Sequence, residues 1–467
     1  MSKRIVVWLF IAAVLLIPLS CRPADDDGGY IAYQAVDEDG DPAPEVVVLD
    51  ASGKELRRIE LPSDIGQLFP YRPSLSGHVL YNDAVVTGKW FLINVVSGEL
   101  HEFDAFGQEQ DMAQPCAASS GYVMLCAQQR IYLLDVQAGT VLDIPVELDP
   151  ADPAPLTVEL VHADTSTFLV RTTGDLWLVP ATDPQDTRRL GRERRPLHAV
   201  LSDDGAFVVY AERTEEGETL IVKETIDGTE SEILLSDADI RGVEFVPQHN
   251  QLVIVRRDAV SLYDLADGEE RILFEPMQVY QALLSAQGEK AALSIRGADS
   301  GETTWSYVDL TEGTKEELDE LEGYQRVHEP DAPRWLFLDD SNWQATEVHI
   351  ASLDLETAKV RKQASLEDAD RLDFVSMTKD GRVGLVQAIS RQGDLQVWLL
   401  VAGQKDAVLL AEGKVGAVQA ALSPAGNWVV LGERESDRPA MTIKLVPTGS
   451  GRKRTLGKGS MPVWARP

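Results

Sequence analysis

The chain has 467 residues, of which 44% are hydrophobic, and this is enough to bury an ample core in one large folded body. It carries 43 basic and 76 acidic residues, a formal net charge of −33 at pH 7. A field of this sign repels polyanions, so the composition excludes nucleic acid as an expected partner and disfavours contact with anionic lipid surfaces.

Residues 1–20 have the features of a secretory signal peptide. Lys3 and Arg4 precede an apolar run of 13 residues at positions 5–17. That run is shorter than the roughly 20 residues a membrane-spanning helix needs. The L-S-C at positions 19–21 resembles the bacterial lipobox, which implies that Cys21 is lipid-modified and becomes the mature N-terminus. An ordinary cleaved signal with a coincidental cysteine is the alternative.

Residues 21–29 are then the lipidated cysteine and a short tether. Arg22, rather than Asp, follows Cys21, which resembles the outer-membrane sorting pattern of enteric lipoproteins. Removal of the signal leaves 41 basic and 76 acidic residues, a net charge of −35. We therefore expect residues 30–467 in the bacterial cell envelope, in the periplasm or on the cell surface, held to the outer membrane by the N-terminal lipid only.

From residue 31 to residue 467 the chain repeats a unit of 40 to 46 residues. Each unit contains short β-branched and aromatic runs bounded by Gly, Pro, Ser and Asp, without a helical pattern. A tight turn after the third run marks each unit, and these turns fall at Gly53, Gly98, Gly139, Pro184, Gly228, Gly268, Gly313, Ala358, Gly403 and Gly449. This period predicts an all-β fold, a β-propeller of four-stranded antiparallel blades with about ten repeats. Ten exceeds the usual range of roughly four to eight blades, so the repeats could form either one wide ring or two separate propellers. The even spacing favours one ring.

The two ends of the chain complete each other. Residues 463–467 form a first strand with no blade after it, and residues 27–33 form a turn and a second strand with no first strand before them. The sequence therefore predicts a propeller closed by pairing of the N- and C-terminal strands, which removes exposed sheet edges.

Joined in this order, W-A-R-P at 464–467 and D-G-G-Y-I-A-Y at 27–33 resemble the W-S-P-D-G-x-x-I-A-F signature of TolB-like (WD40-like) propeller repeats. Residues 201–205 and 422–426 are looser copies. The resemblance implies a propeller fold and a cell-envelope context. The TolB protein has a separate α/β domain before its propeller and none is expected here, so TolB's partners are not carried over.

Two cysteines flank a predicted hairpin turn. Cys116 and Cys126 each lie five residues from Gly121, so a hairpin centred there places them directly opposite, with Cβ atoms about 4.5–5.5 Å apart. In an oxidising compartment this predicts a disulfide, and two reduced, buried side chains are the alternative. His101 and His162 show no ligand spacing with this pair, so no metal site is expected.

Binding is expected on the face turned away from the membrane. The loops that join first to second and third to fourth strands share the face where the tether joins. That tether spans at most about 26–29 Å, so this face should lie near the bilayer. The opposite face carries the long loops that join second to third strands, which are residues 37–45, 213–219, 296–304, 340–346 and 434–440.

Trp343 is the sharpest binding candidate, because it is an aromatic residue in a polar loop. The alternative is that the Trp343 side chain folds back over the blade edge. Two basic clusters also interrupt the acidic background. One comprises Arg188, Arg189, Arg192, Arg194 and Arg195, and the other comprises Arg452, Lys453, Arg454 and Lys458. The alternative for both clusters is a solvated surface without a binding role.

No catalytic motif is present: the sequence has no G-x-S-x-G, no H-E-x-x-H and no phosphate loop. Residues 37–41 begin like a calcium loop, but Pro42 and Val48 occupy its sixth and twelfth positions, where Gly and Glu are required. We therefore expect a monomeric, lipid-anchored, non-catalytic scaffold without cofactor or metal that binds an envelope protein, peptide or glycan. The alternative is a glycan-acting hydrolase with paired carboxylates in the central mouth of the propeller.

Overall fold

The computed structural model describes residues 29–466, with gaps at 72–74, 84–88, 104–113, 119–120, 127–129, 147–156, 160–166, 172–174, 191–195, 203–204, 214–218, 226–227, 237–239, 257–258, 275–278, 297–302, 329, 331–332, 341–346, 368 and 435–439. Within these ranges it consists of 39 strands and two short 3₁₀ helices, η1 (Pro184–Asp186) and η2 (Asp319–Leu321). None of the described helices has the length and apolar character needed to cross a membrane.

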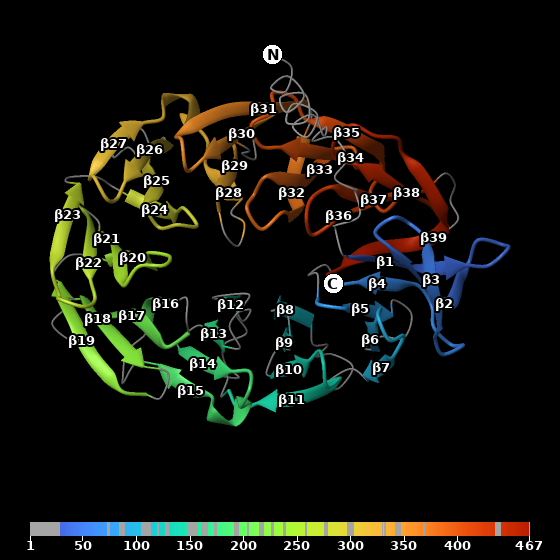
Figure 1. The fold of residues 1–467 in the computed structure, drawn as a ribbon, viewed down its shortest axis with the longest axis horizontal. Coiled ribbons are helices and arrows are strands. Elements are labelled where there is room, and N and C mark those ends of the chain that lie inside the picture. The colour runs from blue at the N-terminus through green and yellow to red at the C-terminus, as the bar shows by residue number, and fades with distance from the viewer. Residues whose placement is uncertain are drawn as a thin grey trace, which may run out of the picture.

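Thirty-two strands form eight separate four-stranded antiparallel sheets around a central opening (Figure 1). Each sheet takes its four strands in chain order, as propeller blades do. The first four sheets comprise β4 (Leu68–Pro70), β5 (His78–Asp83), β6 (Trp90–Asn94), β7 (Leu100–Phe103); β8 (Gln114–Ala118), β9 (Tyr122–Cys126), β10 (Ile131–Asp135), β11 (Thr140–Ile144); β12 (Thr157–Glu159), β13 (Thr167–Arg171), β14 (Leu176–Pro180), β15 (Arg188–Leu190); and β16 (Pro196–Leu201), β17 (Phe207–Arg213), β18 (Thr219–Thr225), β19 (Glu230–Ser236). The next four comprise β20 (Ile240–Phe245), β21 (Gln251–Arg256), β22 (Val260–Asp264), β23 (Glu270–Phe274); β24 (Val279–Leu284), β25 (Lys290–Arg296), β26 (Thr303–Asp309), β27 (Thr314–Glu317); β28 (Arg326–His328), β29 (Trp335–Asp339), β30 (Glu347–Asp354), β31 (Lys359–Glu367); and β32 (Ala369–Met377), β33 (Val383–Ser390), β34 (Asp394–Val401), β35 (Val408–Lys414).

The remaining seven strands form one continuous sheet. Its order is β36-β37-β38-β39-β1-β2-β3, so the chain's first three strands extend its last four. The strands are β36 (Val418–Leu422), β37 (Trp428–Glu433), β38 (Met441–Pro447), β39 (Arg454–Ala465), β1 (Tyr30–Val36), β2 (Pro42–Asp50) and β3 (Glu55–Glu60). The expectation of about ten separate blades is therefore wrong, since eight sheets stand alone and two repeats merge.

The merger occurs because β39 serves two repeats. Its first half pairs with β38, and its second half pairs with β1, placing Tyr30 opposite Ala465 and Ile31 opposite Trp464. Gly459 is shared, since it pairs with Met441 on one side and with a β1 residue on the other. The strand thus crosses from one repeat to the next without the loop that separates other blades.

Buried apolar side chains form ten clusters among the described residues, and nine of them join neighbouring sheets. The tenth packs Ile31 and Val47 against Val430 and Ile443, so the two halves of the seven-stranded sheet face each other across their own core. The sheets are therefore held side by side by apolar burial, the dominant favourable term in folding.

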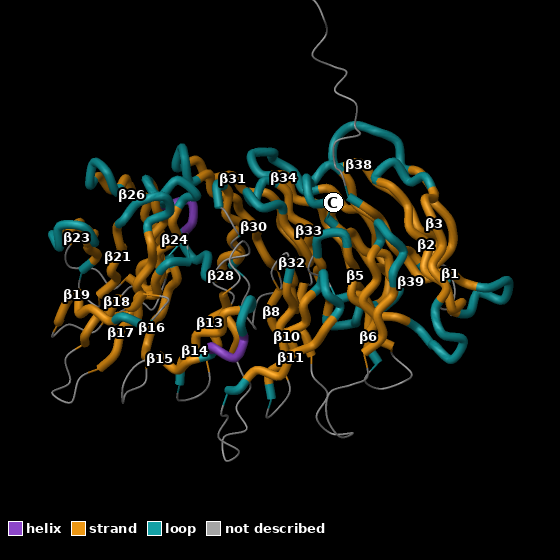
Figure 2. Tube along the Cα trace, turned by 60° about the horizontal axis from the view of Figure 1, so that its bottom comes forward, coloured by secondary structure: helices purple, strands orange, loops and turns teal. Residues whose placement is uncertain are grey.

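The strands run between two rims of loops (Figure 2). Because each sheet is an antiparallel meander, first–second loops and third–fourth turns share one rim. Gly29 leads into β1 on this rim, which we name the proximal face. The second–third loops and the connections between sheets form the distal face.

The marker turns lie on the proximal face, and eight of the ten positions have φ between 57° and 92°. This left-handed conformation favours glycine, which explains the repeat seen in the sequence. The last residue of the third strand holds the turn, as when Asp50 Oδ1 accepts the Lys54 N–H at 2.9 Å. Pro184 departs from the pattern because it opens η1.

Cys116 and Cys126 are joined by a disulfide, with Cα atoms 5.8 Å apart. The predicted direct opposition is wrong in register, because Gln114 lies opposite Cys126. A β-bulge between Pro115 and Ala117 leaves Cys116 without a cross-strand partner of its own. The bulge bends β8 and so brings Cys116 within bonding reach of Cys126.

Candidate functional site

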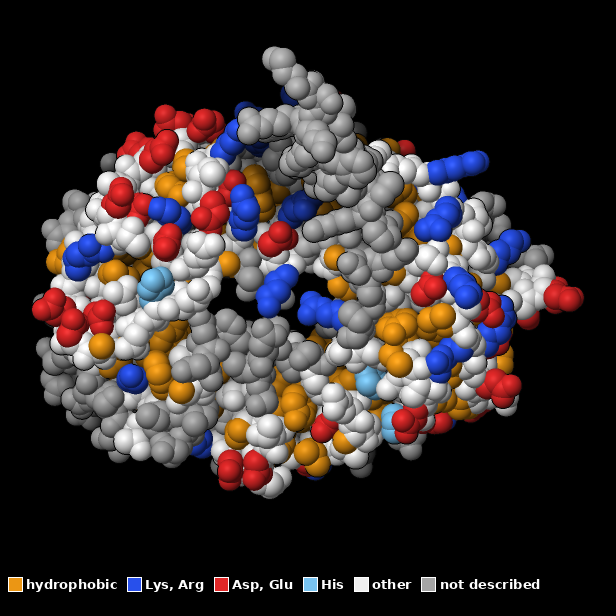
Figure 3. Space-filling view, viewed as in Figure 1, with side chains coloured by type: hydrophobic (Ala, Val, Ile, Leu, Met, Phe, Trp, Pro, Cys, Tyr) orange, Lys and Arg blue, Asp and Glu red, His pale blue; other side chains and the backbone are white. Residues whose placement is uncertain are grey.

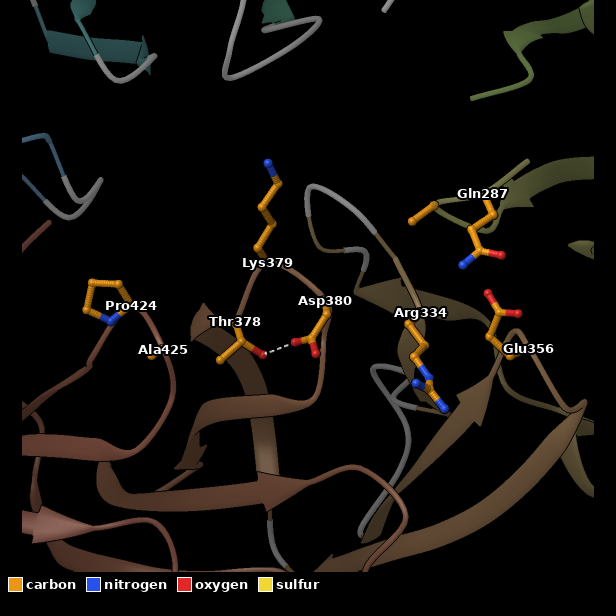
Figure 4. Close-up of a pocket in the computed structure, with 9 residues that line it drawn as sticks. Gln287, Arg334, Glu356, Thr378, Lys379, Asp380, Pro424 and Ala425 are labelled. Atoms are coloured by element: carbon orange, nitrogen blue, oxygen red, sulfur yellow. Dashed lines mark hydrogen bonds between the residues drawn. The ribbon is translucent and has the colours of Figure 1, made fainter. Parts of the chain in front are cut away.

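A cavity with a volume of about 700 Å³ opens on the proximal face, within the described part of the chain. Loops from four neighbouring sheets line it (Figure 4). The lining residues are Ala286, Gln287, Arg334, Glu356, Thr378, Lys379, Asp380, Pro424 and Ala425. We name this cavity the proximal cavity.

Three of its four first–second loops share one local design, a Ser or Thr followed three residues later by Gly. In each, the Gly N–H donates to the carbonyl oxygen of the Ser or Thr at 2.8–2.9 Å. The hydroxyl oxygen of the same Ser or Thr accepts the N–H two residues after the Gly, at 3.0–3.3 Å. The anchoring residues are Ser285, Thr378 and Ser423, all buried. These bonds fix the two residues between anchor and Gly at the cavity rim.

The glycine of each turn packs tightly against the preceding sheet. A Cβ on Gly381 would lie 2.0 Å from the carbonyl oxygen of Trp335, and a Cβ on Gly426 would lie 2.4 Å from Thr378 Cγ2. No side chain fits in such a space, because real Cβ contacts are not this short. Close approach at Gly is thus what brings the turns of successive sheets side by side.

Backbone hydrogen bonds join the loops across the sheets. The Ala286 N–H donates to the Pro333 carbonyl oxygen at 2.9 Å, and the Trp335 N–H donates to the Asp380 carbonyl oxygen at 3.0 Å. The cavity wall is therefore a set of connected turns, a rigid support for side chains that bind a ligand.

Two cations and two carboxylates line the proximal cavity. Asp380 is committed to its own turn, because its Oδ1 accepts the Thr378 hydroxyl at 2.8 Å and the Arg382 N–H at 3.0 Å. The exposed Lys379 points away from the other lining side chains, whereas Gln287 and Glu356 project toward each other (Figure 4).

Arg334 is the second cation of the wall, and its side chain is 54% exposed. Its Nε lies 3.7 Å from Asp354 Oδ1, which orients the guanidinium from the base of the neighbouring turn. The cavity thus offers a guanidinium, a carboxylate and an amide to a polar ligand that carries both signs of charge, and the Lys379 ammonium stands at its rim, directed away from these groups.

A second, smaller cavity of about 140 Å³ lies between the inner strands β4, β32, β36 and β39. Its wall is mostly apolar and includes Phe69, whose side chain is among the exposed large hydrophobic residues at 44%. The buried Oε1 of Gln419 lacks a hydrogen-bond partner within the described structure. This cavity belongs to the wall of the central opening.

The carboxylates with shifted pKa values lie outside both cavities. Burial alone would raise the pKa of Asp309, but hydrogen bonds from Lys290 and Thr311 outweigh it and hold that pKa well below its usual value. Hydrogen bonds from the turn likewise outweigh burial at Asp50 and lower its pKa. Both groups are kept ionised as structural elements of third–fourth turns.

Most sequence-predicted site residues fall outside the described residues. Cys21, Trp343, Arg192, Arg194 and Arg195 are in this group. In the loop that begins like a calcium site, Asp37 Oδ1 accepts the backbone N–H groups of Asp39 and Asp41 at 3.0 and 2.9 Å, so this carboxylate closes a turn. Within the described ranges, no group of three or more His, Cys, Asp or Glu side chains is placed to hold a metal ion.

Sequence reasoning missed the proximal cavity because it directed attention to the distal loops. The repeated Ser/Thr-x-x-Gly turn was the available signal. Such a turn predicts where a strand ends, and it also fixes which residues stand at the rim.

No family model matches the chain, and no curated protein matches it in sequence. In structure it is similar to a eukaryotic initiation factor, with a TM-score of 0.50 at 12% identity over 94% of this chain and 99% of that chain. It is also similar to oligogalacturonate lyase from Vibrio parahaemolyticus, with a TM-score of 0.44 at 10% identity over 72% of this chain and 98% of that chain.

A third similar structure is the tricorn protease, with a TM-score of 0.39 at 10% identity over 94% of this chain and 48% of that chain. The chain therefore spans about half the length of the tricorn protease chain. The fold is a β-propeller. At these identities the similarity extends to the fold and does not reach activity.

Proposed function

We propose that the protein is a lipid-anchored propeller of the bacterial cell envelope, related to TolB-like repeat proteins, and that it is a non-catalytic scaffold whose ligand site is the proximal cavity. The observation that carries the proposal is the rigid rim, in which turns from neighbouring sheets are joined by backbone hydrogen bonds. A preorganised rim lowers the cost of ordering on binding.

The lining chemistry favours a peptide segment over a glycan. None of the nine lining residues is aromatic, so the apolar face of a sugar ring would find no flat partner. Arg334 and Lys379 match carboxylates, and Gln287 and Glu356 match the amide and ammonium groups of a peptide. We therefore propose an envelope peptide or protein segment of mixed charge as the ligand.

Site-specific photo-cross-linking tests this site. A photoreactive residue at position 379 in the full chain, expressed in its own envelope, is expected to give a discrete cross-linked product. The same residue at exposed position 392, in a second–third loop on the distal face, is the matched control. Loss of the product on Arg334→Ala supports the proposal, and equal products from positions 379 and 392 overturn it.

The hydrolase alternative places two carboxylates in the central mouth of the propeller, and at the proximal cavity it would need both carboxylates of the wall. Glu356 and Asp380 are the two carboxylates of the wall, and Asp380 is engaged in its turn. If polysaccharide-cleaving activity is found and Glu356→Gln abolishes it, the non-catalytic assignment is wrong.

A further inference from the structure

Basic side chains gather over the seven-stranded sheet, at the right of the space-filling view (Figure 3). They come from β3, from β39 and from the turns that precede these strands. We name this strip the basic edge, and it comprises Lys54, Arg57, Arg58, Arg452, Lys453, Arg454 and Lys458. All of these are exposed except Arg57, which is half-buried.

The strip is continuous across the two strands. A Cβ on Gly53 would lie 2.5 Å from Leu456 Cδ2, so the turn that carries Lys54 rests on β39. A Cβ on Gly98 would lie 2.9 Å from Arg57 Nη1, so the strip also reaches the adjoining sheet. The basic residues therefore form one surface.

The carboxyl-terminal part of this edge has no acidic residue nearby in sequence. The last 30 residues of the chain contain no Asp or Glu, although the whole chain has 76. Arg454 lies over the Trp428 ring at 5.1 Å, and Lys453 Nζ donates to the Leu410 carbonyl oxygen at 3.4 Å. In contrast, Arg58 is paired with Glu45 and Glu55. The carboxyl-terminal cations are thus available to an external anion.

The basic edge belongs to the sheet that receives the N-terminal segment. β1 pairs directly with β39, and Gly29 leaves the described structure beside Ala465, at the end of β39 farthest from Arg454. Eight residues separate Cys21 from β1, a reach of at most about 26–29 Å. A lipid at Cys21 would hold this sheet near the bilayer.

We propose that the basic edge binds the phosphate groups of anionic membrane lipids and orients the tethered propeller on the bilayer. The proposal rests on the lipid anchor of the proposed function, because the tether is what holds this edge near the membrane. Polybasic segments beside a membrane anchor are attracted to anionic leaflets. A tether alone leaves the body free to rotate, whereas a basic edge selects one orientation.

The acidic net charge does not oppose this contact, because charges farther than about 8 Å are largely screened at physiological ionic strength. The local sign of the edge therefore outweighs the sign of the whole molecule. Because the contact is made by an edge, the ring stands tilted on the bilayer, and the proximal cavity stays open to a ligand.

Lysine labelling on vesicles tests the proposal. The full-length chain is reconstituted through its N-terminus into phosphatidylcholine vesicles and into vesicles that also contain phosphatidylglycerol. A water-soluble acylating reagent is then applied, and modification is quantified by mass spectrometry at Lys54, Lys453 and Lys458. Lys359 and Lys362 of the outer strand β31 are internal references.

The expected result is several-fold slower labelling of the edge lysines on phosphatidylglycerol vesicles, reversed by high salt, with unchanged labelling of the two references. The variant Arg452→Gln/Lys453→Gln/Lys458→Gln should abolish the protection of Lys54. Its matched control, Lys359→Gln/Arg361→Gln/Lys362→Gln, removes the same charge elsewhere and should keep it.

Equal labelling of the edge lysines on both vesicle types overturns the proposal. Protection by soluble polyglutamate without protection by phosphatidylglycerol also overturns it, and points to an acidic protein at this edge. Attachment of the protein to both vesicle types tests the lipid anchor. The difference in lysine labelling between the two vesicle types tests the basic edge. A failure of the anchor and a failure of the edge are thus distinguished.

Discussion

The side-chain Oε1 of Gln34 accepts the backbone N–H of Leu68 at 2.9 Å, and this bond joins the seven-stranded sheet to the next sheet along the chain. Gln34 is fully buried. Its Nε2 donates to the carbonyl oxygens of Gly66 at 2.8 Å and Ala43 at 3.1 Å. One amide thus satisfies three backbone groups where the ends of the chain meet.

Replacing Gln34 with Leu should lower the free energy of unfolding by about 2–3 kcal/mol, because buried backbone groups lose their partner. Chemical denaturation measures the change. Gln281→Leu, at an exposed position on β24, should change stability by less than about 0.5 kcal/mol. Equal effects of the two substitutions would show that Gln34 does not join the sheets.

Gly459→Ala should destabilise the protein by about 1–3 kcal/mol, as overpacking does in a filled core. A Cβ at this position would lie 2.3 Å from Tyr33 Cδ2 and 2.8 Å from the Gln34 carbonyl oxygen. Gly449→Ala is the control, because nothing lies within 4 Å of a Cβ there. A thermal midpoint for Gly459→Ala as high as that of Gly449→Ala would contradict the close packing of β39 against β1 at Gly459.

The propeller should lose part of its stability in acid through Asp309. The pKa of this carboxyl is lowered in the folded state, so its contribution is present above its unfolded pKa of about 3.9 and is lost as pH falls below that value. Asp309→Asn should therefore flatten the dependence of unfolding free energy on pH below about pH 4.

Thr311→Val should flatten the same profile by a smaller amount, because it removes the hydroxyl that donates to Asp309 Oδ1 at 2.6 Å. Urea unfolding at a series of acidic pH values gives both profiles. A profile for Asp309→Asn as steep as that of the unsubstituted protein would refute the assignment.

The disulfide between Cys116 and Cys126 should add about 2–3 kcal/mol to stability, as expected for a closed loop of this length. Dithiothreitol should lower the thermal midpoint of the unsubstituted protein. It should leave the midpoint of the Cys116→Ala/Cys126→Ala variant unchanged. Insensitivity of both proteins to dithiothreitol would mean that the cross-link contributes nothing.

The repeat and the strand order could be predicted from the sequence because both depend on local residues. Gly at the marker positions reflects the left-handed turn, as at Gly53 with φ of 82°, and apolar runs such as β10 occupy the third strand of a blade. The blade count was wrong because the continuity of β39 depends on contacts of Gly459 with Tyr33, more than 400 residues away in the chain.

The proximal cavity could not be predicted because it exists only where loops of four sheets meet. Arg334 and Lys379 lie 45 residues apart in sequence, and only the ring places both in one wall. The predicted direct opposition of Cys116 and Cys126 was wrong for a related reason, because the bulge at Cys116 has no local signal in the sequence. Local patterns report turns and strands, whereas sites between repeats depend on packing.

Pairing of the two chain ends sets where β1 joins the ring, and a cross-link between β1 and β39 measures it directly. Ala32 and Val463 are partners in register and share one buried cluster, so cysteines there should lie within disulfide reach. The Ala32→Cys/Val463→Cys variant should oxidise to a monomer that migrates anomalously on a non-reducing denaturing gel, while each single variant migrates normally. Failure of the folded double variant to cross-link under oxidising conditions would contradict the pairing, and with it the proposal that an N-terminal anchor holds this sheet near the bilayer.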